Sequence, residues 1–113
     1  MSKFDENVAL YKAQNSELGL GLSDELIVAV AKSLGPSIYN ADSSKVSGSD
    51  SKEKETVKNN FLIKKLGLKD GPELDAAIDE AMVKLGTSNR NKYRVVVYAW
   101  LVKKFGKESL YSK

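Results

Sequence analysis

The chain has 113 residues, of which 42% are hydrophobic and 29% are charged, and its formal net charge is +3. This length and composition are typical of one folded domain that buries a core without extra covalent staples. The chain contains no cysteine and no histidine, which excludes disulfides, thiol nucleophiles and the most common general base and metal ligand. We therefore expect one domain over residues 1–113, with no cofactor, no metal site and no catalytic residue that a motif identifies.

The start of the chain lacks the features of a targeting segment. Asp5 and Glu6 stand where a signal peptide would carry basic residues, and no apolar segment follows them. No apolar run approaches the roughly 20 residues that a membrane span needs. These features predict a cytoplasmic protein that does not insert into a membrane.

Two helices are predicted in the first third of the chain. The first covers residues 4–18. Its apolar positions form one narrow stripe at helical spacing: Phe4, Val8, Tyr11 and Leu18. The second covers residues 23–34, with Ser23 as a favourable N-cap and Gly35-Pro36 as its end. Because its apolar arc is very wide, we expect this second helix to lie at the centre of the fold.

A polar, serine-rich stretch over residues 36–49 follows the second helix. It is long for a connection inside a compact domain. Its small apolar islands are Ile38, Tyr39 and Val46. Three alternatives stay open for this loop: it is functional, it is partly mobile, or these apolar residues pin it down.

Two more helices are predicted in the middle of the chain. The third covers residues 50–66, because Asp50 and Glu53 have the spacing of a capping box and Gly67 is a suitable C-cap. The fourth covers residues 72–85 and begins with a proline at its first position. Its apolar stripe consists of Leu74, Ile78, Ala81, Met82 and Leu85.

The fifth segment, residues 93–102, can be interpreted in two ways. Its β-branched residues suit a buried strand. No second strand-like run exists to pair with it, however, and a lone strand leaves its backbone unsatisfied. We therefore predict a fifth helix that is buried on most sides.

The sequence also suggests an internal duplication. Residues 61–67 match residues 100–106 almost class for class, and residues 24–37 align with residues 75–88. The predicted fold is accordingly all-α: a compact bundle of about five helices, arranged as two tandem helical hairpins and an N-terminal helix. Short Lys-Lys-apolar-Gly endings also arise independently, because bases and a left-handed glycine are both favourable at a helix C-terminus.

The basic residues gather at the end of the chain. Residues 87–113 hold seven basic residues and one acidic residue (+6), residues 1–34 hold three and five (−2), and residues 35–86 hold eight and nine (−1). Such asymmetry is typical of proteins that bind nucleic acid or another anion. The alternative is that a basic C-terminal helix packs near an acidic N-terminal helix. The two Lys-Lys pairs could likewise grip phosphates, or they could only compensate the helix dipoles and add solubility at two helix ends. The candidate basic patch consists of Lys64, Lys65, Lys103, Lys104 and Lys107.

A sharper candidate lies where the fifth helix is expected to begin. Arg90 and Arg94 are the only arginines of the chain, and their spacing would place them on one helix face with Lys92 between them. Positive charge is unfavourable at a helix N-terminus, so an external phosphate or carboxylate would resolve the conflict. An internal partner such as Asp42, Asp50 or an acid of the fourth helix would resolve it equally well. The candidate anion site consists of Asn89, Arg90, Lys92 and Arg94.

A second group of polar residues, in the long loop, could adjoin this site. If the two hairpins are equivalent, the corner at residues 35–37 corresponds to the corner at residues 86–88. That correspondence would bring the loop close to the predicted anion site. The alternative is a loop fastened by Asx-turns and a tyrosine anchor. The residues concerned are Tyr39, Asn40 and Asp42.

Three stretches of the chain, residues 33–42, 56–67 and 88–94, together resemble a family of small bacterial proteins. This family is catalogued as the domain of unknown function numbered 2853. The resemblance covers nearly the whole chain and implies a bacterial, cytoplasmic, single-domain protein. It implies no activity, cofactor or catalytic residue.

Three functional hypotheses from different classes follow from these observations. The first is a non-catalytic helical domain that binds a macromolecular partner, namely a protein, because no catalytic motif is present. The second is a nucleic-acid-binding accessory protein that uses the basic C-terminal helix. The third is a binder of a phosphorylated or carboxylated small ligand at the candidate anion site. The sequence does not identify the partner or the oligomeric state.

Overall fold

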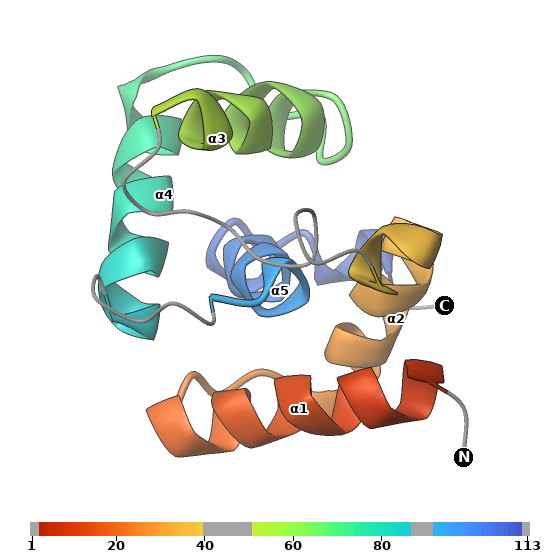
Figure 1. Cartoon of the computed structure of the whole chain (residues 1–113). Helices are drawn as coiled ribbons and strands as arrows, with labels where there is room; N and C mark the ends of the chain where they lie inside the picture. The colour runs from red at the N-terminus through yellow and green to blue at the C-terminus, as the bar shows by residue number, and fades with distance from the viewer. Residues whose placement is uncertain (1–2, 40–50, 87–91, 112–113) are drawn as a thin grey trace.

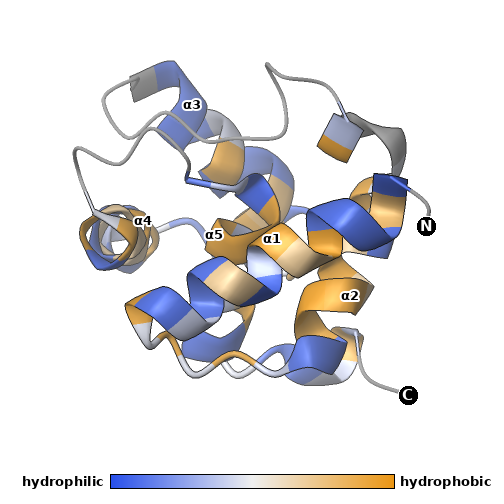
Figure 2. Ribbon diagram, turned by 60° about the horizontal axis from the view of Figure 1, so that its bottom comes forward, coloured by the Kyte–Doolittle hydropathy of each residue, from blue (hydrophilic) through white to orange (hydrophobic). Residues whose placement is uncertain are grey.

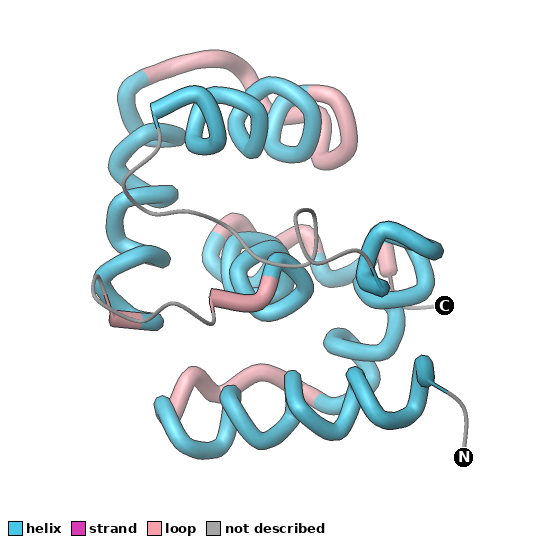
Figure 3. The backbone as a smooth tube through the Cα atoms, viewed as in Figure 1, coloured by secondary structure: helices cyan, strands magenta, loops and turns pink. Residues whose placement is uncertain are grey.

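The computed structural model describes residues 3–39, 51–86 and 92–111. The α-helices of these residues are α1 (Lys3–Leu18), α2 (Asp24–Leu34), α3 (Ser51–Thr56), α4 (Pro72–Leu85) and α5 (Arg94–Lys104) (Figure 1). Two short 3₁₀ helices, η1 (Gly35–Tyr39) and η3 (Glu108–Leu110), and a π-helix, η2 (Val57–Ile63), complete the regular structure (Figure 3). The predicted all-α fold class is confirmed. None of the helices in these ranges is long and apolar enough to cross a membrane.

Helix α5 lies at the centre of the bundle, and α1, α2 and α4 pack against it (Figure 1). Its side chains are buried around most of its circumference, including the five consecutive residues from Val95 to Ala99. A helix that is apolar on most sides is buried on most sides. The prediction that residues 93–102 form a buried helix rather than a strand is therefore confirmed.

Helix α2 does not occupy the central position that its wide apolar arc predicted. Four of its residues are buried where α2 packs on α5 and α1: Leu26, Ile27, Val30 and Ala31. On its outer face, Val28 and Ala29 are only half-buried. The prediction of a central α2 is wrong, because the centre of the core is occupied by α5, whose consecutive residues Val95, Val96 and Val97 are fully buried. Helix α2 lies at the side of the bundle and its ribbon is largely coloured as hydrophobic (Figure 2), while Val28 and Ala29 are left half-buried.

The predicted boundaries of α2 are confirmed by its caps. The Ser23 hydroxyl accepts a hydrogen bond from the Leu26 amide at 3.1 Å, as expected of an N-cap. Gly35 ends the helix with φ of 62°, in the left-handed region that glycine adopts without steric cost. The chain then continues as η1, in which Ile38 is buried. The first residues of the predicted loop 36–49 are therefore a 3₁₀ helix, whereas residues 40–49 lie outside the described ranges.

Helix α1 follows its predicted stripe. Val8 and Tyr11 are buried, and Phe4 and Leu18 pack against the core. The Tyr11 ring meets the ring of Tyr93 edge to face, with 5.2 Å between the centroids. This contact fixes α1 beside the start of α5.

The third predicted helix changes its winding at residue 57. The amide of Lys64 donates to the carbonyl of Asn59, and the amide of Leu66 donates to the carbonyl of Phe61, both five residues back. Each turn of such a π-helix takes in more residues than an α-turn. Positions four, five and nine residues after Val57 consequently return to the same face. Val57 and the apolar residues at these three positions are all buried. The three residues are Phe61, Leu62 and Leu66.

Of the two predicted hairpins, the packing of the helices matches the second, which pairs α4 with α5. The first, which would pair α2 with the helix predicted over residues 50–66, does not match the main contacts of either segment. Helix α4 packs against α5, whereas η2 packs mainly on α4, and α2 packs on α5 and α1. Both Lys-Lys segments end at a glycine with positive φ, 72° at Gly67 and 66° at Gly106. Such endings are common at helix C-termini, so the internal duplication stays a prediction.

Candidate functional site

The structure describes two residues of the candidate anion site, Lys92 and Arg94, while Asn89 and Arg90 lie outside the described ranges. Helix α5 begins at Arg94, so Lys92 precedes the helix, and its side chain is buried. The prediction that residues 90–94 occupy the first helical turns is therefore wrong for Lys92. Tyr93 takes an extended N-cap conformation instead.

Arg94 has an internal partner. Its guanidinium forms an ion pair with the carboxylate of Glu53 in α3, and the side chains are 12% and 22% exposed. It also donates a hydrogen bond to the Tyr98 hydroxyl at 2.9 Å. The unfavourable positive charge at the start of α5 is thus offset from inside the molecule. The alternative of an internal carboxylate is therefore correct in kind, but the partner is Glu53 and not one of the acids expected from the sequence.

Burial and contact act in opposite directions on these groups. Burial lowers the pKa of Arg94, but its contacts with Tyr98 and Glu53 more than offset this, so the pKa is raised overall. Burial raises the pKa of Tyr98, although the nearby guanidinium opposes the shift. The ring of Phe61 stacks on the Tyr98 ring with 3.9 Å between the centroids. The cluster ties α3, η2 and α5 together.

The residues of the adjoining loop are described only in part. Tyr39 ends η1 and is 48% exposed. Asn40 and Asp42 lie outside the described ranges. Whether these three residues adjoin the anion site therefore stays a prediction.

Several lysines of the candidate basic patch contact other parts of the molecule. Lys103 donates to the carbonyl of Gly21 at 2.7 Å. Lys104 pairs with Glu80 at 3.0 Å, and Lys65 lies over the ring of Tyr111, 5.7 Å from its centroid. The ammonium groups of these three lysines therefore already have contacts within the molecule. The remaining members of the patch are Lys64, which is exposed, and Lys107, which is half-buried.

The acidic face of α4 is also paired. Asp79 contacts Lys54 at 2.8 Å, and Asp75 lies 3.4 Å from Lys58, so ion pairs cross the seam between α4 and the preceding helical segment. No group of three or more potential metal ligands occurs among the described residues. The geometry of these acids is that of surface ion pairs.

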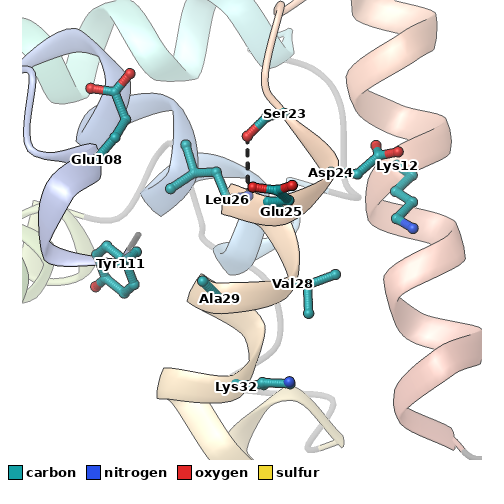
Figure 4. A pocket seen from close by; sticks show the side chains of 10 residues that line it. All are labelled: Lys12, Ser23, Asp24, Glu25, Leu26, Val28, Ala29, Lys32, Glu108 and Tyr111. Carbon is teal, nitrogen blue, oxygen red and sulfur yellow. Dashed lines mark hydrogen bonds between the residues drawn. The ribbon is translucent and has the colours of Figure 1, made fainter. Parts of the chain in front are cut away.

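A groove of about 830 Å³ runs along the outer face of α2 (Figure 4). Lys12 of α1 lies on one side, and Glu108 and Tyr111 of the C-terminal segment lie on the other. Val28 and Ala29 are the half-buried apolar residues of its floor. The full lining is Lys12, Ser23, Asp24, Glu25, Leu26, Val28, Ala29, Lys32, Glu108 and Tyr111.

Charged residues mark the two ends of this groove. Glu25 lies in the first turn of α2, and Lys32 lies in its last turn. Both side chains are exposed, and neither forms an ion pair with another described residue. This arrangement differs from α4 and α5, where lysines or arginines pair with carboxylates.

The sequence does not predict the groove, because the wide apolar arc of α2 points to a helix covered on all its apolar sides. A usable signal was present in the spacing. Glu25, Val28, Ala29 and Lys32 follow one another at steps of three, one and three residues, which places them on one helix face. The two charges at its ends distinguish this face from the fully apolar one.

The described residues thus define a class of protein: a small all-α domain with an open groove along one surface helix. The chain belongs to the family described as "Protein of unknown function (DUF2853)", whose model matches residues 9–109. The predicted family resemblance is confirmed. The match includes every residue that lines the groove except Tyr111. No curated protein matches the chain.

Proposed function

We propose that this protein is a non-catalytic binding domain, and that the α2 groove binds a segment of a protein partner. The observation that carries the proposal is the outer face of α2, where half-buried apolar residues lie between exposed charges that form no ion pair with another described residue. Apolar floors with charged rims favour protein segments that are themselves amphipathic. A groove on a rigid helix also needs little reorganisation on binding.

The charge of the groove supports a protein partner over a nucleic acid. Three carboxylates line it, those of Asp24, Glu25 and Glu108, against the two lysines Lys12 and Lys32, and carboxylates repel phosphates. The two alternatives from the sequence, nucleic-acid binding and anion binding, have weaker support because Arg94 and Lys103 already contact internal acceptors. The bacterial origin and the cytoplasmic location stay sequence-based predictions.

Site-specific photo-crosslinking in the producing cells tests this function. A photoreactive residue is placed at Ala29 in the groove, and a matched one at Ala76, which is exposed on α4. We expect products from position 29 and not from position 76, with the crosslink mapped to an amphipathic helical segment of the captured chain. The substitution Val28→Asp should remove the product, because it places a charge in the apolar floor.

Equal yields from positions 29 and 76, or no product from either, would contradict the proposal. Products that survive Val28→Asp would contradict it as well. The melting temperature of each variant, followed by circular dichroism, controls for loss of folding.

A further inference from the structure

The outer face of α2 is complementary to itself. Its four residues in chain order are acidic, apolar, apolar and basic: Glu25, Val28, Ala29 and Lys32. The midpoint of this pattern lies between residues 28 and 29. Reversing the direction of the helix therefore exchanges the acid with the base and one apolar residue with the other.

This pattern is what an antiparallel pair of identical helices requires. In such a pair, positions at equal distances from the midpoint face each other across a twofold axis. Glu25 then lies opposite Lys32 of the second copy, and Lys32 lies opposite its Glu25. Val28 lies opposite Ala29 of the second copy, and the small alanine lets the two helices approach closely.

We infer that the α2 groove binds a second copy of this chain, with the two α2 helices antiparallel about a twofold axis. The inference rests on the proposed function and names the partner. Charge complementarity is its main support, because the two charges have no ion-pair partners among the described residues, whereas Lys54 and Lys104 do. The four residues of the face carry one acid and one base and so do not repel those of a second copy, while the wider groove adds Lys12, Asp24 and Glu108.

The size of the surface limits the strength of the dimer. Helix α2 has 11 residues and is therefore about 16 Å long. A pair of helices of this length, with the groove rims, gives an interface at the small end of the range for specific complexes. We accordingly expect a weak and reversible dimer that forms as the protein concentration rises.

Charge reversal tests the pairing directly by sedimentation equilibrium of the full chain at concentrations up to about 1 mM. Either Glu25→Lys or Lys32→Glu places like charges at both symmetric contacts. We expect each to weaken dimerisation by roughly tenfold, since two exposed ion pairs become repulsive. The double variant Glu25→Lys/Lys32→Glu restores opposite charges and should dimerise as the wild type does.

Mixing the two single variants gives the sharpest readout. Each variant alone is predicted to be mainly monomeric, but a mixture pairs two lysines with two glutamates and should form a heterodimer. A folding defect cannot produce this outcome. The matched control is Glu17→Lys, an identical charge change at an exposed position of α1, which should leave the dimer unchanged.

Three results would overturn the inference. They are a monomeric wild type up to about 1 mM, a double variant that stays monomeric, and a control that weakens the dimer as strongly as the α2 variants. If the wild type is monomeric while position 29 still crosslinks to another protein, only the second copy is excluded and the proposed function stands. If position 29 gives no product either, the proposed function fails too.

Discussion

Arg94, the first residue of α5, donates a hydrogen bond at 2.9 Å to the hydroxyl of Tyr98, one turn further along the same helix. The same guanidinium pairs with Glu53 of α3. A single side chain thus stabilises the start of the central helix and fastens a neighbouring helix to it. Because this charge pair is mostly withdrawn from water, loss of either partner would leave the other charge poorly solvated.

The first prediction concerns the loss of this side chain. Arg94→Ala leaves the Glu53 carboxylate without its cation in a half-buried position, so we expect the free energy of unfolding to fall by about 2 kcal/mol. Lys104→Ala is the control. It breaks an ion pair with Glu80 whose side chains are 36% and 47% exposed, and it should cost less than about 1 kcal/mol. Urea denaturation of both variants measures the two losses in the free energy of unfolding. Equal losses would show that the Arg94–Glu53 pair stabilises the fold no more than an exposed surface pair does.

The second prediction concerns stability at high pH. Burial, reinforced by the nearby Tyr93 and Tyr39, raises the pKa of Tyr11 from 10.0 to about 12. Between these values the unfolded chain has lost the phenolic proton and the folded chain has kept it. The free energy of unfolding therefore keeps its full value below pH 10, as far as Tyr11 is concerned, and falls as the pH rises from 10 towards 12. A shift of this size corresponds to roughly 2–3 kcal/mol.

The control for this pH dependence is Tyr11→Phe, which cannot lose a phenolic proton at this position. Lysine ion pairs also weaken in this pH range, but they do so equally in both proteins. We expect the wild type to lose more stability than Tyr11→Phe between pH 9 and about pH 11.5 in urea titrations. Parallel losses in the two proteins would show that Tyr11 ionises as easily in the folded state as in the unfolded state.

The third prediction tests why η2 is a π-helix. Asn60 is exposed, and its deletion brings Phe61, Leu62 and Leu66 to three, four and eight residues after Val57. These are the spacings of one face of an α-helix, so the shortened chain should keep its core with a loss within about 1 kcal/mol. Backbone chemical shifts should show a continuous α-helix there.

Deletion of Glu80, which is exposed in the middle of α4, is the matched control for Asn60. It rotates the following apolar residues of a regular α-helix away from the core and should cost at least about 3 kcal/mol. Similar losses for the two deletions would mean that the extra residue in η2 is not accommodated by the π-turn.

The fourth prediction concerns the end of α5. Gly106 has φ of 66°, and its amide and that of Lys107 donate to Lys103 and Val102, the two hydrogen bonds of a Schellman motif. Nothing lies close to a Cβ added at Gly106, so the cost of Gly106→Ala is conformational, about 1 kcal/mol. Gly106→Asn should cost less because asparagine tolerates this region better. Thermal unfolding compares the two, and a neutral alanine would argue against the left-handed cap.

Much of the helical structure was predictable because it depends on local signals. Ser23, Pro72 and the glycines at 35, 67 and 86 mark helix ends through capping and backbone preferences that act within a few residues. The stripe of α4 was predictable for the same reason. The π-turn of η2 was not predicted, because it depends on the core that Val57 and Phe61 must reach together.

The candidate site was less predictable than the fold. The conflict between the charge of Arg94 and a helix N-terminus follows from the sequence, but an external anion and an internal acid would resolve it equally well. That choice depends on where Glu53 lies, 41 positions earlier in the chain. Similarly, the lysine at 103 could be identified as a basic residue, but not as a donor to the carbonyl of Gly21.

The sequence by itself therefore determined most of the α-helices and their ends, the all-α class and the family, since these follow from short-range backbone preferences and apolar periodicity. The tertiary structure alone decided which apolar helix became the centre. The valines of α5 are buried at the centre. In α2, Val28 and Ala29 lie at the surface between the charged residues Glu25 and Lys32. Which of two apolar helices is covered depends on packing between segments far apart in the chain. The charges that flank Val28 and Ala29 mark an outward face of α2 in the sequence, but they do not tell which helix becomes the centre.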